Sequence, residues 1–352
     1  MSFNIGNLTI TVAGESHSSG LTVILEGIKP GMEIDMDEIY SFMQRRAPGK
    51  NRFSTPRKEA DLPEILSGVK NGFSTGSAIA AVIRNTNTKS KDYGDELDVP
   101  RPGHADYPAS IKFGKYFDFC GGGQFSGRIT ATLCFAGGIA KCILKKHGIN
   151  VLAHISEIHG IEDKSYKDTV VDVSNKDFPV IDDESGIKMM DEIDKARENL
   201  DSVGGKIECI VEGIPAGIGD SLFGGLDGEL AKAIFGIPAV KGIEFGAGFD
   251  VCEMFGSENN DEYYMDDGAV KTKTNNHGGI LGGITTGMPL IFNTAFKPTP
   301  SIAKEQNSVS LKEGSDTKLS VHGRHDPCIV QRAVPVVEAV TALVILGKLG
   351  GI

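Results

Sequence analysis

The sequence contains no tryptophan and fewer basic than acidic residues, 36 against 47, which gives a formal net charge of −11 at pH 7. General nucleic-acid binding normally needs a net basic face, so this balance argues against it. The most apolar late segment, residues 336–346, is interrupted by Glu338 and is shorter than the roughly 20 residues that span a bilayer. No basic and apolar leader precedes the first strand-like run, so we expect a cytoplasmic protein that spans no membrane.

Cysteine pairs at the spacing of redox or zinc motifs are also missing. The six cysteines are scattered along the chain, and no CxxC pair occurs. In a chain of this size without an export signal, they are most simply reduced thiols in the core. A structural zinc site needs clustered ligands, so we expect no metal.

Glycine, in contrast, is abundant, with 45 residues in the chain and runs at 121–123 and 282–283. Glycine permits positive φ and close backbone approach, so such runs indicate tight turns or a bound ligand. The hydrophobic content of 40% and the charged content of 24% are those of a globular protein with a sizeable core.

Hydrophobic periodicity predicts an α+β fold with antiparallel sheets, because strands follow one another before a helix occurs, unlike a strict βαβ alternation. No Ser- or Pro-rich linker divides the chain, so we expect one domain over residues 1–352. The predicted strands are 8–12, 21–26, 65–68, 78–84, 150–159, 209–212 and 289–296. The predicted helices are Asp35 to about Arg46, about Arg128 to His147, 187–200, 226–235 and the segment after Pro327, with Ser126 and Asp326 as N-caps.

Residues 45–58 carry six basic side chains and no acid. A solvated basic loop is one interpretation of such a charge run. A mobile loop that closes over phosphate is the other, because the planar guanidinium of arginine can grip phosphate oxygens with two hydrogen bonds.

Residues 101–130 bring together groups suited to proton transfer and anion binding. The segment begins with Arg101 and a His104/Asp106 pair, passes through the glycine run and ends at the predicted helix start near Ser126. The N-terminus of a helix favours an anion, so the segment predicts a phosphate-handling active site. It is not a P-loop, since the GK[ST] ending is absent.

Taken together and in this order, the motifs resemble the chorismate synthase family from residue 6 to about 349. They are GESH at 14–17, RRAPGKNR at 45–52, RPGHAD at 101–106, SGRIT at 126–130, NNHGGILGG at 275–283, KPTPS at 297–301 and GRHDP at 323–327.

The resemblance implies an enzyme that converts 5-enolpyruvylshikimate 3-phosphate to chorismate by 1,4-anti elimination of phosphate. It also implies a requirement for reduced FMN without net redox change, a β-α-β sandwich fold and a homotetramer. Some members of the family reduce flavin with NADPH themselves, and others rely on a separate flavin reductase. No extra reductase domain is evident in this chain, so we expect an external supply.

The resemblance also implies roles for individual residues. His17 would protonate the reduced flavin or balance its charge, His104 would be the acid toward the leaving phosphate, and Asp326 would help to remove the C6 proton with flavin N5. The implied cofactor-binding residues are Gln124, Phe125, Ser126, Ala239, Gly282, Lys297, Pro298, Thr299, Pro300, Ser301 and Arg324, with Arg46 and Arg52 toward a nicotinamide nucleotide. The implied substrate-binding residues are Ser16, Arg45, Arg46, Arg52, Ser126, Arg128 and Arg324.

The sequence departs from the family pattern near the flavin. Gln124 and Phe125 stand where Arg and Ser are common, Gly127 replaces Ala, Pro238 replaces Asn, and Ser18 replaces Gly.

Two other functions compete with the elimination enzyme. A non-catalytic flavin-binding protein would need no acid or base, which the two histidines and the aspartate argue against. An RNA-binding protein conflicts with the net charge.

Overall fold

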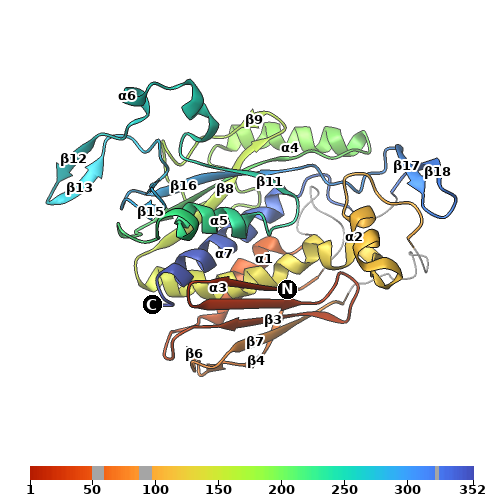
Figure 1. The fold of residues 1–352 in the computed structure, drawn as a ribbon, viewed down its shortest axis with the longest axis horizontal. Coiled ribbons are helices and arrows are strands. Elements are labelled where there is room, and N and C mark those ends of the chain that lie inside the picture. Colours follow the sequence, from red (N-terminus) through yellow and green to blue (C-terminus); the bar gives the residue numbers. More distant parts are fainter. Residues whose placement is uncertain (50–58, 87–96, 322–324) are drawn as a thin grey trace.

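The computed structural model describes residues 1–49, 59–86, 97–321 and 325–352. Two antiparallel sheets of five strands each form its outer layers (Figure 1). The first sheet has the order β1 (Ser2–Ile5), β2 (Leu8–Ala13), β3 (Gly20–Glu26), β7 (Ile79–Arg84) and β4 (Pro63–Ser67). The second has the order β11 (Val240–Phe245), β16 (Leu290–Phe296), β10 (Gly205–Glu212), β8 (Asn150–Ile158) and β9 (Ile161–Glu162).

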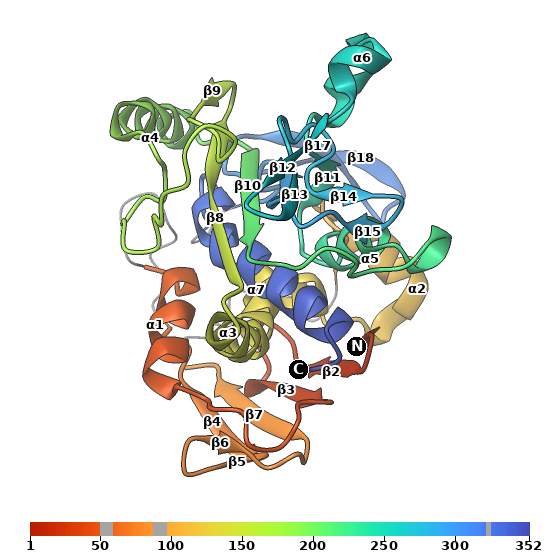
Figure 2. The same ribbon diagram turned by 90° about the vertical axis from the view of Figure 1, so that its left-hand side faces the viewer.

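A layer of helices lies between the two sheets and packs its apolar side chains into the core with theirs (Figure 2). It consists of α1 (Met36–Arg46), α3 (Thr130–Lys146) and α7 (Val330–Lys348). α3 and α7 approach closely at Gly137, where a methyl group would lie 2.3 Å from Cβ of Ala339. The predicted α+β sandwich of antiparallel sheets around helices is therefore confirmed.

Further elements surround this sandwich. α4 (Asp183–Glu198) lies on the outer side of the second sheet, and α5 (Leu226–Ile234) contacts α7. α2 (Asp106–Phe113) and α6 (Gly256–Asn259) belong to peripheral segments. The small hairpins are β5 (Val69–Lys70) with β6 (Phe73–Ser74), β12 (Tyr263–Asp266) with β13 (Ala269–Thr272), β14 (Ile280–Leu281) with β15 (Ile284–Thr285), and β17 (Gln306–Ser310) with β18 (Ser315–Leu319).

One buried carboxylate joins the three central helices. Glu338 of α7 accepts hydrogen bonds from Nη1 and Nη2 of Arg45 at 2.9 and 2.6 Å, and it also pairs with Lys141 of α3. Burial alone would raise the pKa of Glu338, but the charges of Arg45 and Lys141 outweigh it and lower the pKa. Loss of one partner would leave a buried charge uncompensated, so the three side chains stabilise the helix layer only together.

Two helices of the described chain are long and apolar enough to cross a membrane, Gly127–Lys146 and Val330–Lys348. They are 83% and 89% buried inside the protein. The same apolar character therefore serves the core between the two sheets. The second helix extends well beyond the apolar run at 336–346 that the sequence indicated.

The helix ends confirm one predicted N-cap and correct the other. The Ser126 hydroxyl accepts a hydrogen bond from the backbone amide of Arg128 at 3.3 Å, where a 3-10 turn (Gly127–Ile129) leads into α3. The prediction that Asp326 caps the last helix is wrong, because α7 begins at Val330 after Ile329. Asp326 pairs instead with Arg332 at 2.7 Å. The sequence also gave no indication of α2, whose eight residues have little helical periodicity.

His154 forms a buried charge cluster on the outer face of the second sheet. Its Nδ1 lies 3.1 Å from Asp163 and its Nε2 lies 2.9 Å from Glu208. Glu208 also accepts hydrogen bonds from the Ser165 hydroxyl and the Tyr166 amide, which keep it ionised. Both ring nitrogens face carboxylates, so both carry protons. Burial alone would lower the pKa of His154, but the two carboxylates reverse this and raise it.

This cluster should make stability depend on pH in a defined direction. The pKa of His154 is higher in the folded protein than in the unfolded chain, where it is about 6.5. Such a group stabilises the fold fully at pH values below the unfolded-state pKa. The stabilisation is lost as the pH rises through the folded-state pKa. We expect the difference in unfolding free energy between wild type and His154→Gln to be largest near pH 6.5 and to shrink as the pH is raised. Urea unfolding at several pH values above 6.5 measures it.

The matched control is His159→Gln, because the His159 side chain is 63% exposed in its pair with Glu192. Exposed pairs contribute little to stability, so this variant should stay near wild type at every pH. A stability difference for His154→Gln that does not change above pH 6.5 would show that the imidazole is not held in its charged form.

Candidate active site

Two histidines predicted from the sequence pack against consecutive glycines. Gly121, Gly122 and Gly123 have φ values of 59, 88 and 52°, in a region that only glycine adopts readily. A methyl group at Gly121 would lie 2.3 Å from Cε1 of His17, and one at Gly122 would lie 3.1 Å from Nε2 of His104. The glycine run therefore lets the loop that carries His17 and the loop that carries His104 approach the same turn.

His104 is oriented by an ionised carboxylate. Its Nδ1 lies 2.6 Å from Oδ1 of Asp106. Arg101 donates to both oxygens of that carboxylate, from Nε at 2.7 Å and from Nη2 at 2.8 Å. Burial alone would raise the pKa of Asp106, but the hydrogen bonds and charges of Arg101 and His104 outweigh it and hold the pKa well below its usual range.

This geometry fixes which imidazole nitrogen faces the site. An ionised carboxylate can only accept hydrogen bonds, so Nδ1 of His104 donates to Asp106. The contact of 3.2 Å between Nδ1 and Nη2 of Arg101 follows from their sharing of one carboxylate oxygen. Nε2 remains as the atom that can exchange a proton with a ligand beside Gly122. The side chain of His104 is 13% exposed, which leaves it accessible.

Residues 297–301, predicted to bind cofactor, lie against this site. The Lys297 ammonium donates to the carbonyl oxygen of Gly103, and Nη1 of Arg101 donates to the Ser301 hydroxyl at 3.0 Å. A methyl group at Gly103 would lie 3.6 Å from Pro300. The KPTPS turn and the RPGHAD loop thus form one continuous surface, although about 200 residues separate them in sequence.

Ala239 and Thr299 continue the same surface. The carbonyl oxygen of Ala239 accepts from the Lys297 amide at 3.0 Å, and Ala239 has a φ of 73°, which is unusual for a residue with a side chain. The Ser202 hydroxyl donates to the carbonyl oxygen of Thr299 at 2.7 Å. Among the described residues, the buried Thr299 hydroxyl oxygen has no hydrogen-bond partner of its own. Such an atom suits a polar ligand.

Asp326 lies near this surface through the residues that flank it. The carbonyl oxygen of Pro327 accepts from the Val203 amide at 2.9 Å, next to Ser202. The pKa of His325 is lowered, first by burial and then by the charge of Arg101, so this histidine lies close to the His104 loop.

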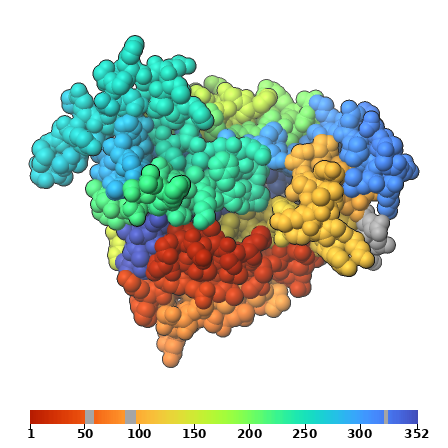
Figure 3. Space-filling view, viewed as in Figure 1, coloured from red at the N-terminus to blue at the C-terminus, as the bar shows by residue number. Residues whose placement is uncertain are grey.

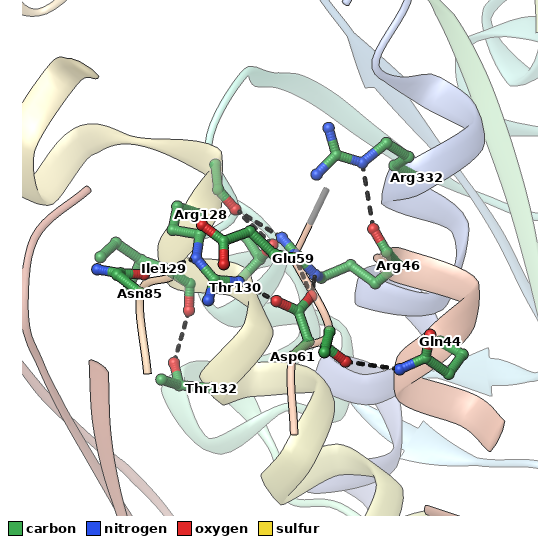
Figure 4. Close-up of polar contacts among 12 residues, drawn as sticks. Gln44, Arg46, Glu59, Asp61, Asn85, Arg128, Ile129, Thr130, Thr132 and Arg332 are labelled. Carbon is green, nitrogen blue, oxygen red and sulfur yellow. Dashed lines mark hydrogen bonds and ion pairs between the residues drawn. The ribbon is translucent and has the colours of Figure 1, made fainter. Parts of the chain in front are cut away.

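A second group of predicted residues surrounds a carboxylate that sequence reasoning missed (Figure 4). Asp61 accepts hydrogen bonds from Arg46, through Nε at 3.1 Å and through Nη2, and from Nη1 of Arg128. Arg46 and Arg128 are only 2% and 6% exposed. The one sequence signal for Asp61 is that acidic residues resume directly after the basic segment 45–58.

Of the other predicted residues, Gly282 and Arg45 lie apart from these groups, whereas Ser16, Gln124 and Phe125 adjoin the glycine run beside His17. Gly282 is in the turn between β14 and β15, toward the left-hand end of Figure 1, whereas α2 lies toward the right. Arg45 is paired with Glu338 inside the helix layer. Phe125 packs its ring 6.0 Å from Phe117, centre to centre, and Gln124 beside it is half-buried. Ser16 is buried and donates its amide to the Gly123 carbonyl at 3.1 Å. Arg52, Arg324 and residues 50–58 of the predicted phosphate-closing loop 45–58 lie outside the described residues.

The α+β fold and a histidine oriented by an ionised carboxylate, beside paired arginines and a lysine, are typical of an enzyme active site. The chain matches the family model for chorismate synthase over residues 8–349. It is 48% identical to chorismate synthase from Pyrococcus abyssi over 97% of this chain and 96% of that protein. It is 45% identical to the enzyme from Dehalococcoides mccartyi (strain BAV1) over 98% and 96% of the two chains.

A crystal structure of a chorismate synthase is similar to the present structure with a TM-score of 0.78 and 29% identity, over 98% of this chain and 92% of that one. The chain belongs to the chorismate synthase family. It is a carbon–oxygen lyase acting on phosphates, and it converts 5-enolpyruvylshikimate 3-phosphate to chorismate by 1,4-anti elimination of phosphate. The resemblance seen in the sequence motifs is confirmed.

The contact between Gly122 and His104 gives a direct test of the site. In Gly122→Ala, the new methyl group must displace His104, and an alanine with a φ of 88° is strained. His104 must shift by a few tenths of an ångström. Misplacement by about 1 Å can cost on the order of 10² in rate, so we expect this smaller shift to lower kcat by up to about tenfold. Phosphate release under saturating substrate measures the effect.

Gly127→Ala is the matched control, because nothing lies within 4 Å of a methyl group at that position and its backbone is not in the left-handed region. It should keep wild-type turnover. Equal turnover in the two variants would show that His104 is not needed where the structure holds it.

Proposed function

We propose that the elimination takes place beside His104 and His17, with reduced FMN bound against the surface formed by residues 297–301. The observation that carries this proposal is the orientation of His104. Because Asp106 accepts the proton of Nδ1, Nε2 is the atom that delivers a proton to the departing phosphate. Histidine suits this task, since its ordinary pKa of about 6.5 lets it hold and release a proton near neutral pH.

The proton that leaves C6 needs an acceptor, and Asp326 is the group we assign to it. Arg332 donates to its Oδ2 at 2.7 Å, which fixes the position of the carboxylate. The neighbourhood of His325 to Arg101 supports an arrangement in which Asp326 and His104 border the same substrate. One histidine acid and one aspartate base then serve the two ends of a 1,4-elimination.

The residues on this surface fit a flavin phosphate and ring. The buried Thr299 hydroxyl, the left-handed Ala239 and the neighbouring Lys297 offer a donor, a close backbone approach and a cation. When bound, reduced FMN supplies electron density to the reaction without net redox change. His17 holds a proton beside it. The other proposed cofactor contacts are Gln124, Phe125, Ser126, Pro298, Pro300, Ser301 and Arg324. Gly282, in the turn between β14 and β15, lies away from this surface and is left out of the proposed contacts.

The substrate carries a phosphate and two carboxylates, so we assign its binding to Ser16, Ser126, Arg52 and Arg324 together with the arginines of the site. Arg45, Arg46 and Arg128 are engaged by internal carboxylates. They therefore act on the ligand through their neighbours and through their charge. The burial of Arg46 also supports delivery of reduced flavin by a separate reductase over direct contact with NADPH at that residue.

Replacement of His104 tests the proposed acid. With 5-enolpyruvylshikimate 3-phosphate and photoreduced FMN under anaerobic conditions, we expect His104→Ala to lose on the order of 10²–10⁴ in kcat, the usual contribution of a general acid. Chorismate absorbance and phosphate release should fall together. The control is His159→Ala, on the surface in its pair with Glu192, which should turn over like wild type. Turnover of His104→Ala near the wild-type rate would remove His104 from the mechanism.

A non-catalytic flavin-binding protein on the same scaffold is the second candidate. The same assay separates it, because such a protein would bind FMN and release no phosphate from the substrate. The oriented His104 favours the enzyme, since binding alone needs no acid.

The proposed homotetramer has support from a segment that projects from the body, shown in teal at the upper left in Figures 1 and 3. It contains the hairpin β12–β13 and exposes large apolar side chains, among them Phe249 at 79%, Phe255 at 77% and Met265 at 67%. A two-stranded hairpin is marginally stable alone, and exposed apolar clusters mark interaction sites. We propose a cytoplasmic homotetramer in which other copies of the chain cover these apolar surfaces.

Light scattering after size exclusion should give about four times the chain mass of 37.4 kDa. Phe255→Glu would introduce a charge into the covered surface and should shift the protein to smaller species at low concentration. A monomeric wild type at assay concentrations would contradict the tetramer.

A further inference from the structure

We propose that Asp61 is a positioning residue for the elimination, which holds the guanidinium groups of Arg46 and Arg128 and sets the charge beside Asp326. This inference rests on the proposed function, in which Asp326 and Ser126 border the substrate. Asp61 itself touches neither substrate nor cofactor, because its side chain is 0% exposed.

The carboxylate joins parts of the chain that are otherwise separate (Figure 4). Arg46 ends α1, Arg128 precedes α3, and Asp61 stands just before β4. Oδ2 of Asp61 accepts from Arg46 and Oδ1 accepts from Arg128, so each oxygen holds one guanidinium. The other side of Arg128 is fixed by Asn85, whose Oδ1 accepts from Nε at 2.9 Å. Neither arginine can turn without loss of a buried charged hydrogen bond.

The backbone of Asp61 points to the same conclusion. Its φ is 50°, in the left-handed region that residues with side chains rarely adopt. Such a conformation persists only where the surroundings determine it, and these conformations gather at active sites. The two arginines supply that determination here, since both act on the same carboxylate.

Charge balance gives Asp61 a second effect. Burial alone would raise its pKa, but the charges of Arg46 and Arg128 outweigh it and lower the pKa, so the carboxylate is ionised. It separates two buried cations that repel each other, since the charge of Arg46 adds to burial in lowering the pKa of Arg128. Removal of this one negative charge would leave the pair with an additional net positive charge.

Two short routes carry these effects toward the reacting groups. In the first, Nε of Arg332 donates to the backbone carbonyl of Arg46 at 3.1 Å, and its Nη1 donates to Asp326 at 2.7 Å. In the second, the backbone amide of Arg128 donates to the Ser126 hydroxyl at 3.3 Å. Along these hydrogen bonds, only Arg128 stands between Asp61 and Ser126. Two residues, Arg46 and Arg332, stand between Asp61 and Asp326.

Several charged and titratable groups of the described residues act on this network, including Cys134 beside Arg46 and Asp61, and Arg101 beside His325. Arg46, Arg128 and Glu59 act on Asp61 and its partners, and Arg332 and His325 act on Asp326. Glu59 is already engaged by Thr86, whose hydroxyl donates to it at 2.7 Å. A change at Asp61 therefore reaches Asp326 as a change in the net positive charge of the arginines beside it.

Asp61→Asn keeps the shape of the side chain and removes its charge. We expect kcat to fall about tenfold to a hundredfold, because the guanidinium groups lose their fixed orientation. KM for the anionic substrate should stay level or decrease, since the site gains positive charge. The acid limb of the profile of kcat/KM against pH should move to lower pH. The assay uses the full chain with photoreduced FMN under anaerobic conditions.

Glu208→Gln is the matched control for the loss of a buried carboxylate. Glu208 is 2% exposed and pairs with His154, on the outer face of the second sheet. This variant should also lower Tm, but its kcat, KM and acid limb should remain those of wild type. If Asp61→Asn behaves in the same way, with a lower Tm and unchanged kinetics, Asp61 is a structural residue and the proposal is overturned.

Asp61→Glu keeps the test decisive if the asparagine variant does not fold. The longer side chain retains the charge and displaces the two guanidinium groups, so kcat should fall while the acid limb stays in place. A wild-type kcat in this variant would overturn the positioning role. Failure of the proposed function is distinguished by His104→Ala: if that variant is impaired and the Asp61 variants are not, only the inference about Asp61 is wrong.

Discussion

The ion pairs of Glu338 fix the three helices on which both the sandwich and the site depend. Arg45 of α1 and Lys141 of α3 meet this one carboxylate of α7 between the two sheets. The ends of the same helices supply the residues around Asp61, because Arg46 ends α1, Arg128 leads into α3 and Arg332 lies in the first turn of α7. Of the two neighbouring arginines at the end of α1, Arg45 therefore pairs with Glu338 in the core. Arg46 pairs with Asp61 at the site.

Short-range features of the site could be predicted from the sequence. His104 and Asp106 are two residues apart, and Ser126 caps the turn that leads into α3, as its position before an apolar run indicated. The strands and most helices follow from periodicity. The partners of Arg45 and Arg46 could not be predicted, because successive helical residues point in different directions and their carboxylates lie 293 and 15 residues away. Asp326 was predicted to cap the last helix because it precedes an apolar run. Its actual partner, Arg332 in the first turn of α7, could not be foreseen from that pattern.

The electrostatics of the site differ from those expected of a cleft lined with free cations. The chain carries a net charge of −11, and each arginine that the structure describes near the site has a carboxylate partner. Paired arginines attract an anion less strongly than free ones, but they are held in position before it arrives. Fixed dipoles and charges of this kind need no reorganisation during the reaction, which is the main way in which enzymes stabilise developing charge.

The central place of α7 has a consequence for how the protein is made. This helix spans Val330–Lys348 and packs against strands of both sheets, against α1 and against α3. In the chain it follows every strand of both sheets, so it leaves the ribosome after all of them. Until α7 emerges, the inner faces of both sheets lack this helix, so the nascent chain exposes apolar strands that can aggregate. The sandwich can close only once α7 is free to pack between the two sheets.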